Sequence, residues 1–292
     1  MEKFLLFSVL LLAALSNWSC GVVNTVAVNA TTNIVDFGLV SIFEESDLDL
    51  AEKSIPANLT LVEALYRAKD RDDDHLAFLL LQGYTGYTLG FVEDVDADRA
   101  KVLYARARDY GLSILKKHKQ FAEAMNQDAA AFKKSLDSFD KSDVPVIFWT
   151  GIAWGNLINV GLSDPNIIVD LPKVNALMEF VLEHDEGYFY GGAHFYFGTI
   201  LATIPKNLGG KPDSARAHFE RCFELGHNKL LLPFVYMAKT YCVQVQDREL
   251  FVKLLKTVDE SSVDILPEQR LVNAIAKRKA KKLSERIDDL FF

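Results

Sequence analysis

The chain has 292 residues, of which 50% are hydrophobic and 25% are charged. This composition is sufficient for a large apolar core and excludes wholesale disorder, which requires low hydrophobicity and high net charge. The formal net charge of −8 argues against a nucleic-acid-binding protein, and three cysteines are too few for a disulfide framework.

Residues 1–19 are typical of a secretory signal peptide. Their apolar run, from Phe4 to Leu15, is too short to cross a bilayer. Cys20 stands between a serine and a glycine, as at the processing site of a bacterial lipoprotein, although Asn17 and Trp18 are unusual there. We predict that Cys20 is acylated and anchors the chain to the membrane, with cleavage at another position as the alternative. The glycine after Cys20, where inner-membrane lipoproteins have aspartate, favours the outer membrane.

The rest of the chain is predicted to be all-α. Residues 20–50 are expected to form the lipidated N-terminus and a tether, and residues 51–292 a single helical domain. From about Leu59 the apolar spacing is helical, and no stretch shows the period-two alternation of a strand. The expected helices lie near residues 59–69, 75–91, 98–117, 120–139, 146–160, 172–184, 190–204, 213–225, 230–245, 247–257 and 267–288.

Three aspartates are predicted to cap helices. Asp98, Asp213 and Asp247 each stand just before an apolar-periodic run, where a carboxylate accepts hydrogen bonds from the first free backbone N–H groups. Prolines at 145 and 267 mark helix breaks.

Two segments, residues 98–111 and 213–226, repeat one pattern. In each, small residues flank an aromatic residue, which is Tyr104 in the first copy and Phe219 in the second. The pattern is typical of tetratricopeptide repeats, whose antiparallel helix pairs bury their faces by stacking. We therefore predict stacked antiparallel helix pairs with irregular tetratricopeptide-like repeats, forming an α-α superhelix. A generic helical bundle is the alternative.

Residues 187–197 concentrate aromatic rings around a histidine. Rings that are not needed between helices could line a concave ligand surface, whereas the alternative is that all of them belong to the core. The candidate ligand-binding residues are Trp149, Trp154, Tyr188, Tyr190, His194 and Tyr196.

The sequence offers no convincing catalytic or metal motif. Acidic residues and a histidine adjoin one another at 183–186, but neighbouring side chains on a helix diverge. Asp94, Asp96 and Asp98 have the spacing of a calcium loop without its glycine or its bidentate glutamate. No G-x-S-x-G nucleophile motif is present. We predict no metal, no catalytic residue and no cofactor.

Two further features have structural interpretations. Cys222 and Cys242 occupy helical core positions and are predicted to be buried thiols rather than a disulfide bridge. The basic run at 277–282 is predicted to be a solvated helix end that the helix dipole favours. The alternative for this run is a docking patch for an acidic partner.

A family resemblance is carried by Gly191-Gly192-Ala193-His194-Phe195-Tyr196-Phe197-Gly198, by residues 209–212 and by residues 215–220. These segments resemble the lipoproteins associated with tripartite ATP-independent periplasmic (TRAP) transporters, the tetratricopeptide or T-component family. Residues 55–59 and 104–111 also look like the N-terminal half of that family. The resemblance extends over roughly residues 50–257.

The resemblance implies an all-helical lipoprotein of the bacterial envelope that faces the periplasm. Such proteins form oligomers with internal channels or clefts and are thought to work beside an extracytoplasmic solute receptor; no catalytic residues are assigned to them. We therefore predict a non-enzymatic homo-oligomer that binds the solute receptor of a TRAP transporter, a small apolar-leaning ligand, or both, and no nucleic acid. The alternatives are a scaffold for cell-envelope assembly and an unrecognised metal-dependent or hydrolytic enzyme.

Overall fold

The computed structural model describes residue 38 and residues 41–162, 164–204 and 210–291. This part of the chain is all-α, as predicted, and has no strand among its residues. The predicted signal peptide, Cys20 and most of the predicted tether lie outside the described residues.

The elements that build the fold follow one another with short connections. Their bounds are α2 (Leu48–Ala68), α3 (Asp74–Tyr87), the π-helix η1 (Thr88–Val92), α4 (Ala97–Leu115), α5 (Lys119–Ala124), α6 (Ala129–Ser135), α7 (Val144–Val160), α8 (Pro165–Ile168), α9 (Leu171–Asp185), α10 (Tyr188–Thr203), α11 (Pro212–Leu225), α12 (Leu232–Met237), the π-helix η5 (Ala238–Cys242), α13 (Val243–Val245), α14 (Arg248–Glu260), α15 (Arg270–Ser284) and α16 (Ile287–Leu290).

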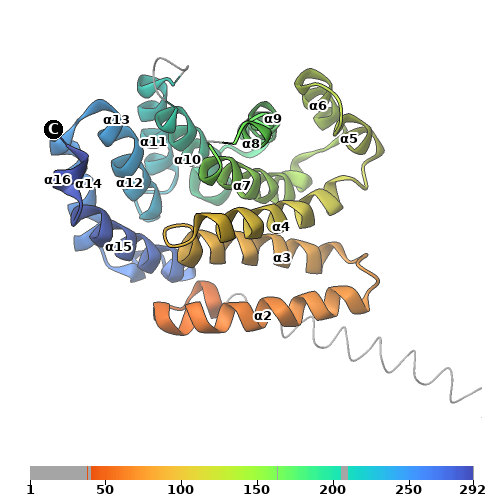
Figure 1. Cartoon of the computed structure of the whole chain (residues 1–292), viewed down its shortest axis with the longest axis horizontal. Coiled ribbons are helices and arrows are strands. Elements are labelled where there is room, and N and C mark those ends of the chain that lie inside the picture. The colour runs from red at the N-terminus through yellow and green to blue at the C-terminus, as the bar shows by residue number, and fades with distance from the viewer. Residues whose placement is uncertain (1–37, 39–40, 163, 205–209, 292) are drawn as a thin grey trace, which may run out of the picture.

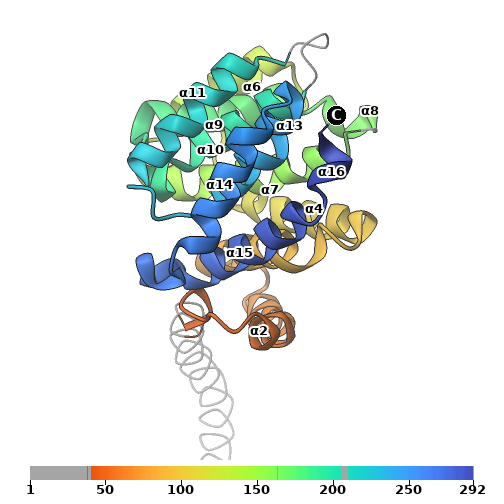
Figure 2. The ribbon, with the colours of Figure 1, turned by 90° about the vertical axis from the view of Figure 1, so that its left-hand side faces the viewer.

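Successive helices lie side by side in a curved stack (Figure 1). The helices α2, α3, α4 and α7 form consecutive layers, and α7 continues through α9 to the pair α10 and α11. The chain then turns through α12 and α14 into α15, which packs against both α12 and α2. Figure 2 shows α14, α15 and α16 together on the side that closes the stack. The curve therefore brings the last long helix back beside the first.

The first long helix begins earlier than predicted, because Pro56 is accommodated inside it. The carboxylate of Asp47 caps α2 by accepting from the backbone N–H groups of Asp49 and Leu50, at 2.9 and 3.1 Å. Ala51, Ile55 and Leu59 are buried on one face, so the apolar face extends through the proline. Tertiary burial of this face outweighs the local cost of Pro56.

The prediction of one helix over residues 120–139 is wrong. The segment forms α5 and α6, and Asp128 caps α6 by accepting from the backbone N–H of Ala131 at 2.8 Å. The break lets Phe121 and Phe132 meet at a ring-centroid distance of 5.1 Å, with both side chains fully buried. Burying two phenylalanine rings outweighs the backbone regularity of a continuous helix.

One of the three predicted caps is confirmed. Asp247 caps α14 by accepting from the backbone N–H of Leu250 at 2.9 Å. The helix α4 begins earlier than predicted and is capped by Asp96 rather than Asp98. Lys211 stands at the cap position of α11. Asp213 lies in the first turn of that helix, where the helix dipole stabilises its negative charge.

The two copies of the repeat pattern occupy equivalent core positions. Tyr104 and Phe219 are both fully buried, in the pairs α3–α4 and α10–α11. At Gly198 a Cβ atom would stand 2.9 Å from the Phe219 ring, so glycine permits the close approach of α10 and α11. Gly83, which precedes Gly198 by the same 115 positions that separate Tyr104 from Phe219, instead faces Leu59 of α2. The two helix pairs thus bury equivalent rings, but their glycines accommodate different neighbouring residues. This combination is compatible with irregular tetratricopeptide-like repeats.

Candidate functional site

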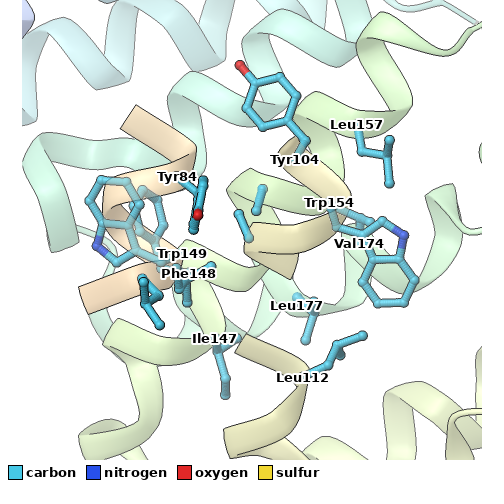
Figure 3. Close-up of a cluster of buried hydrophobic side chains, with 14 of the residues drawn as sticks. Tyr84, Tyr104, Leu112, Ile147, Phe148, Trp149, Trp154, Leu157, Val174 and Leu177 are labelled. Carbon is cyan, nitrogen blue, oxygen red and sulfur yellow. The ribbon is translucent and has the colours of Figure 1, made fainter. Parts of the chain in front are cut away.

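The two predicted ligand-binding tryptophans lie within the core of the stack. The side chains of Trp149 and Trp154 point to opposite sides of α7, and the two residues are 6% and 3% exposed (Figure 3). Trp149 contacts the rings of Phe148 and Phe189, at 5.6 and 5.0 Å between centroids. The guanidinium of Arg108 lies 5.6 Å from the centre of the Trp154 ring. Both indoles are therefore enclosed by side chains of neighbouring helices.

Tyr188 and Tyr190 stand at a strained backbone kink at the start of α10. Phe189, Tyr190 and Gly191 have φ angles of 46°, 59° and 76°, in the left-handed region. This region is unfavourable for the two aromatic residues and costs about 1–3 kcal/mol each. The contacts that hold the segment include the hydrogen bond that the Tyr190 hydroxyl donates to Glu268 at 3.1 Å and the packing of the Tyr188 ring on Phe148, with the centroids 5.1 Å apart.

His194 belongs to a polar cluster that joins the start of α10 to α11. Its Nδ1 lies 2.8 Å from Nδ1 of His218, and its Nε2 lies 3.0 Å from Glu186. Arg221 donates to both oxygens of Glu186, at 2.8 and 2.9 Å. Hydrogen bonds from Arg221 and then from His194 lower the pKa of Glu186 to about 2. Burial, followed by the charge of His194, lowers the pKa of His218.

We expect Arg221→Gln to move the pKa of Glu186 from about 2 back toward 4.5. In the folded wild-type protein the pKa of Glu186 is low, so the ionised carboxylate is favoured. The ionised Glu186 therefore stabilises the folded state above about pH 4.5, and this contribution disappears as the pH falls toward 2. NMR titration of the Glu186 carboxyl carbon measures the change. The matched control is Arg216→Gln, because Arg216 pairs with Glu220 instead. A Glu186 pKa that stays near 2 in the Arg221 variant contradicts the assignment.

Tyr196 is 7% exposed and lines a small cavity between α7, α10 and α12. Its hydroxyl donates to Asn175 at 2.8 Å. The cavity measures about 40 Å³, little more than one water molecule. In its wall, the side-chain nitrogen of Asn156 is buried without a hydrogen-bond partner among the described residues. This cavity therefore offers a ligand one free donor and little room.

A larger apolar cavity, which no sequence motif predicted, lies between α2 and α3. It measures about 150 Å³, and α15 contributes Leu271 to its wall. A Cβ atom added at Gly86 would have no neighbour within 4 Å, so that glycine faces open space. The sequence signal was the pair of glycines on the apolar face of α3. The lining residues are Gly38, Ile42, Phe43, Ile55, Asn58, Leu59, Leu61, Val62, Leu79, Gln82, Gly83, Gly86, Tyr87 and Leu271.

A buried ionic cluster joins the π-helix η1 to the C-terminal helices. The carboxylate of Glu93 accepts hydrogen bonds from the hydroxyls of Tyr104 and Tyr236 at 2.5 and 2.6 Å, and from Lys279 at 2.9 Å. The side chains of Glu93 and Lys279 are each only 7% exposed. Lys279 also contacts Asp94. Burial alone would raise the pKa of Asp94, but Lys279 and Lys239 together hold it below its usual value. Burial, and then Glu93, raises the pKa of both tyrosines.

The prediction of a solvated basic helix end is wrong for the first half of the run. Lys277 donates to the carbonyls of Asp259 and Ser261 at the end of α14, at 2.5 and 2.8 Å. Arg278 donates to the Gly90 carbonyl at 2.6 Å, and its guanidinium lies 4.8 Å from the centre of the Phe91 ring. These cations cap carbonyls that would otherwise lack donors. Lys281 and Lys282 remain exposed.

The candidate metal ligands have other partners. Asp96 serves as a helix cap, and Asp94 pairs with Lys279. In the described part of the chain, no group of three or more His, Cys, Asp or Glu side chains could hold a metal ion. Cys222 and Cys242 are free and buried, as predicted, and burial raises the pKa of each thiol to about 12.

Comparison with known proteins places the chain in a family. A model of the TRAP transporter T-component matches residues 44–291, which is most of the sequence. The chain belongs to the TRAP transporter T-component family. An uncharacterized protein of Treponema pallidum (strain Nichols) is similar to it, with 23% identity over 269 residues, covering 85% of this chain and 81% of that protein. Membership associates this T-component with a TRAP transporter and thereby with the cell envelope. None of its helices, within the ranges described, is both long and apolar enough to span a bilayer.

Proposed function

We propose that this T-component is a non-enzymatic, periplasm-facing lipoprotein that supports a TRAP-type secondary transporter by binding its solute receptor, a small apolar ligand, or both. The family match over residues 44–291 carries the proposal. Acylation of Cys20 would hold the protein at the membrane, with the outer membrane as the proposed site.

The contacts of the buried and half-buried carboxylates support a binding function rather than catalysis. The carboxylate of Glu93 is saturated by two tyrosine hydroxyls and a lysine. A second carboxylate, Glu186, belongs to a different cluster and is held by Arg221 and His194. Both of these partners are distant in the chain from Glu93. A general acid or base needs a free proton-transfer position beside a substrate site. Both clusters instead connect helices of the stack.

The cavity between α2 and α3 is the proposed site for the apolar ligand. Its wall consists mostly of aliphatic side chains and glycines, so a hydrocarbon segment would gain contacts without leaving polar groups unpaired. Transfer of each CH₂ group from water contributes about 0.8 kcal/mol. A volume of about 150 Å³ suits a short segment of an aliphatic chain. Trp149, Trp154, Tyr188, Tyr190, His194 and Tyr196 remain proposed secondary contacts, of which Tyr196 already lines a cavity.

We expect Gly86→Leu to abolish retention of an apolar ligand without unfolding the protein. The new side chain enters open space at Gly86, and replacing a helical glycine adds helix propensity. Native mass spectrometry of detergent-released protein measures retained ligand, and thermal unfolding measures stability. Ser113→Leu, which adds the same side chain at an exposed position of α4, is the control. Equal retention by wild type and Gly86→Leu excludes this cavity as the site.

The same mass spectra test the anchor and the assembly. We expect an acyl mass on Cys20 and a homo-oligomer. A chain processed at another position, without that cysteine, contradicts lipidation.

Receptor binding is tested in cells by crosslinking followed by affinity purification. We expect the recovered partners to include an extracytoplasmic solute receptor or a transporter subunit. A Cys20→Ser variant is the control for non-specific membrane capture, because it lacks the proposed anchor. Recovery of envelope-assembly proteins alone would support the scaffold alternative and contradict the transport role.

A further inference from the structure

A second cavity, separate from the apolar one, lies between α12, η5 and the C-terminal end of α15. It measures about 350 Å³ and also reaches Asp94, in the turn that follows η1. In Figure 1, α12 and α15 lie next to each other on the side where the stack closes. The lining residues are Asp94, Val235, Tyr236, Lys239, Lys279, Lys282, Leu283, Glu285 and Arg286.

The lining is predominantly cationic. Four of its side chains are basic and two are acidic. Asp94 is already held by Lys279 and Lys239, with Lys239 at 3.5 Å. Glu93 lies behind the cavity wall and pairs with Lys279. Counting its charge reduces the net positive charge of the lining from two to one. Lys282 and Arg286 are exposed and have no ion-pair partner among the residues that the structure describes. Glu285 is also exposed in the lining, so Lys282 and Arg286 leave one net positive charge at the cavity mouth.

The floor of the cavity is apolar. Val235, Tyr236 and Leu283 are buried beneath the basic side chains. The Tyr236 hydroxyl is occupied by Glu93, so its ring, rather than its oxygen, is available to a ligand. Lys239 lies 5.7 Å from the centre of that ring. An inorganic ion would use the basic side chains and leave this floor exposed, whereas an organic anion would contact both.

We propose that this cavity binds a small organic anion, with Lys282 and Arg286 contacting the charged group and the Tyr236–Leu283 floor contacting an apolar body. Arginine offers a fork of donors that fits planar anionic groups, and lysine adds a flexible point charge. Both side chains are exposed and make no buried contact, so they can be replaced without disturbing the Glu93–Lys279 cluster. The site is independent of the apolar cavity and of the transport role.

The test uses benzoate as the probe, benzamide as its neutral counterpart and sulfate as a plain ion, in calorimetric titrations of the intact mature protein at low ionic strength. We expect saturable binding of benzoate that weakens about tenfold or more in the double variant Lys282→Gln/Arg286→Gln, because a charge-assisted contact is lost. We also expect added salt to weaken the binding. Lys281→Gln, a neighbouring exposed lysine outside the cavity, should bind benzoate like the wild type.

Several results would overturn the proposal. Benzoate that does not bind the wild type, or binds the double variant equally well, excludes recognition by these two residues. Benzamide binding as tightly as benzoate excludes recognition of charge, and sulfate binding as tightly excludes a contribution from the apolar floor. Thermal unfolding of the double variant near the wild-type midpoint ensures that lost binding reports on the cavity.

Discussion

Replacing Glu93 with alanine is expected to destabilise the folded protein by about 3–5 kcal/mol, because it removes one partner of a buried ion pair together with the acceptor of two buried hydroxyls. The side chains of Glu93 and Lys279 are each 7% exposed, and the carboxylate also accepts from Tyr104 and Tyr236. Asp94 can still pair with Lys279, but the two buried hydroxyls lose their acceptor. Urea unfolding, with the midpoint and slope both fitted, measures the change.

The matched control for this variant is Glu220→Ala. Glu220 pairs with Arg216 on an exposed face of α11, and such surface pairs contribute about 0–1 kcal/mol. A loss below about 1 kcal/mol in the Glu93 variant would show that the cluster does not hold η1, α4, α12 and α15 together.

Phe219→Ala is expected to destabilise the protein by about 3–5 kcal/mol, the usual cost of truncating a fully buried aromatic side chain. Phe219 fills the space between α10 and α11, directly opposite Gly198. The glycine has no side chain that could fill the resulting void, so the loss of stability that comes from the cavity should be near its full size. Differential scanning calorimetry or urea unfolding measures the loss.

Leu50→Ala provides a large-to-small control on the surface, because Leu50 is 54% exposed. Its cost should be within about 0.5 kcal/mol. If Phe219→Ala is as mild as this control, ring burial between paired helices is not what stabilises α10 and α11.

Local sequence patterns predicted the helical class and the principal buried rings. Tyr104 and Phe219 could be predicted as ring positions of the helix pairs, because a helix that buries one face has apolar residues at helical spacing along that face. The start of α2 was placed near Leu59 rather than at Leu48, and the split between α5 and α6 was missed although Asp128 is of a residue type that favours the N-cap position. Tertiary packing decided both cases.

Contacts between distant segments could not be predicted. Lys279 and Glu93 are 186 positions apart, and nothing in the basic run distinguishes Lys279, which is buried, from Lys282, which is exposed. The cavity between α2 and α3 likewise depends on Leu271 of α15 arriving from the far end of the chain. Of the predicted ligand residues, the tryptophans lie in the core and Tyr196 lines a small cavity, and their role in binding remains a prediction.

The proposed binding of this T-component to a solute receptor is tested most directly by a titration of the two purified proteins. The mature chain, in detergent, is titrated with the solute receptor of a TRAP transporter from the same cell and followed by sedimentation velocity. A receptor of an unrelated transporter serves as the control. We predict a saturable complex with the first receptor and none with the second. Receptor that sediments independently at every soluble concentration would contradict the claim.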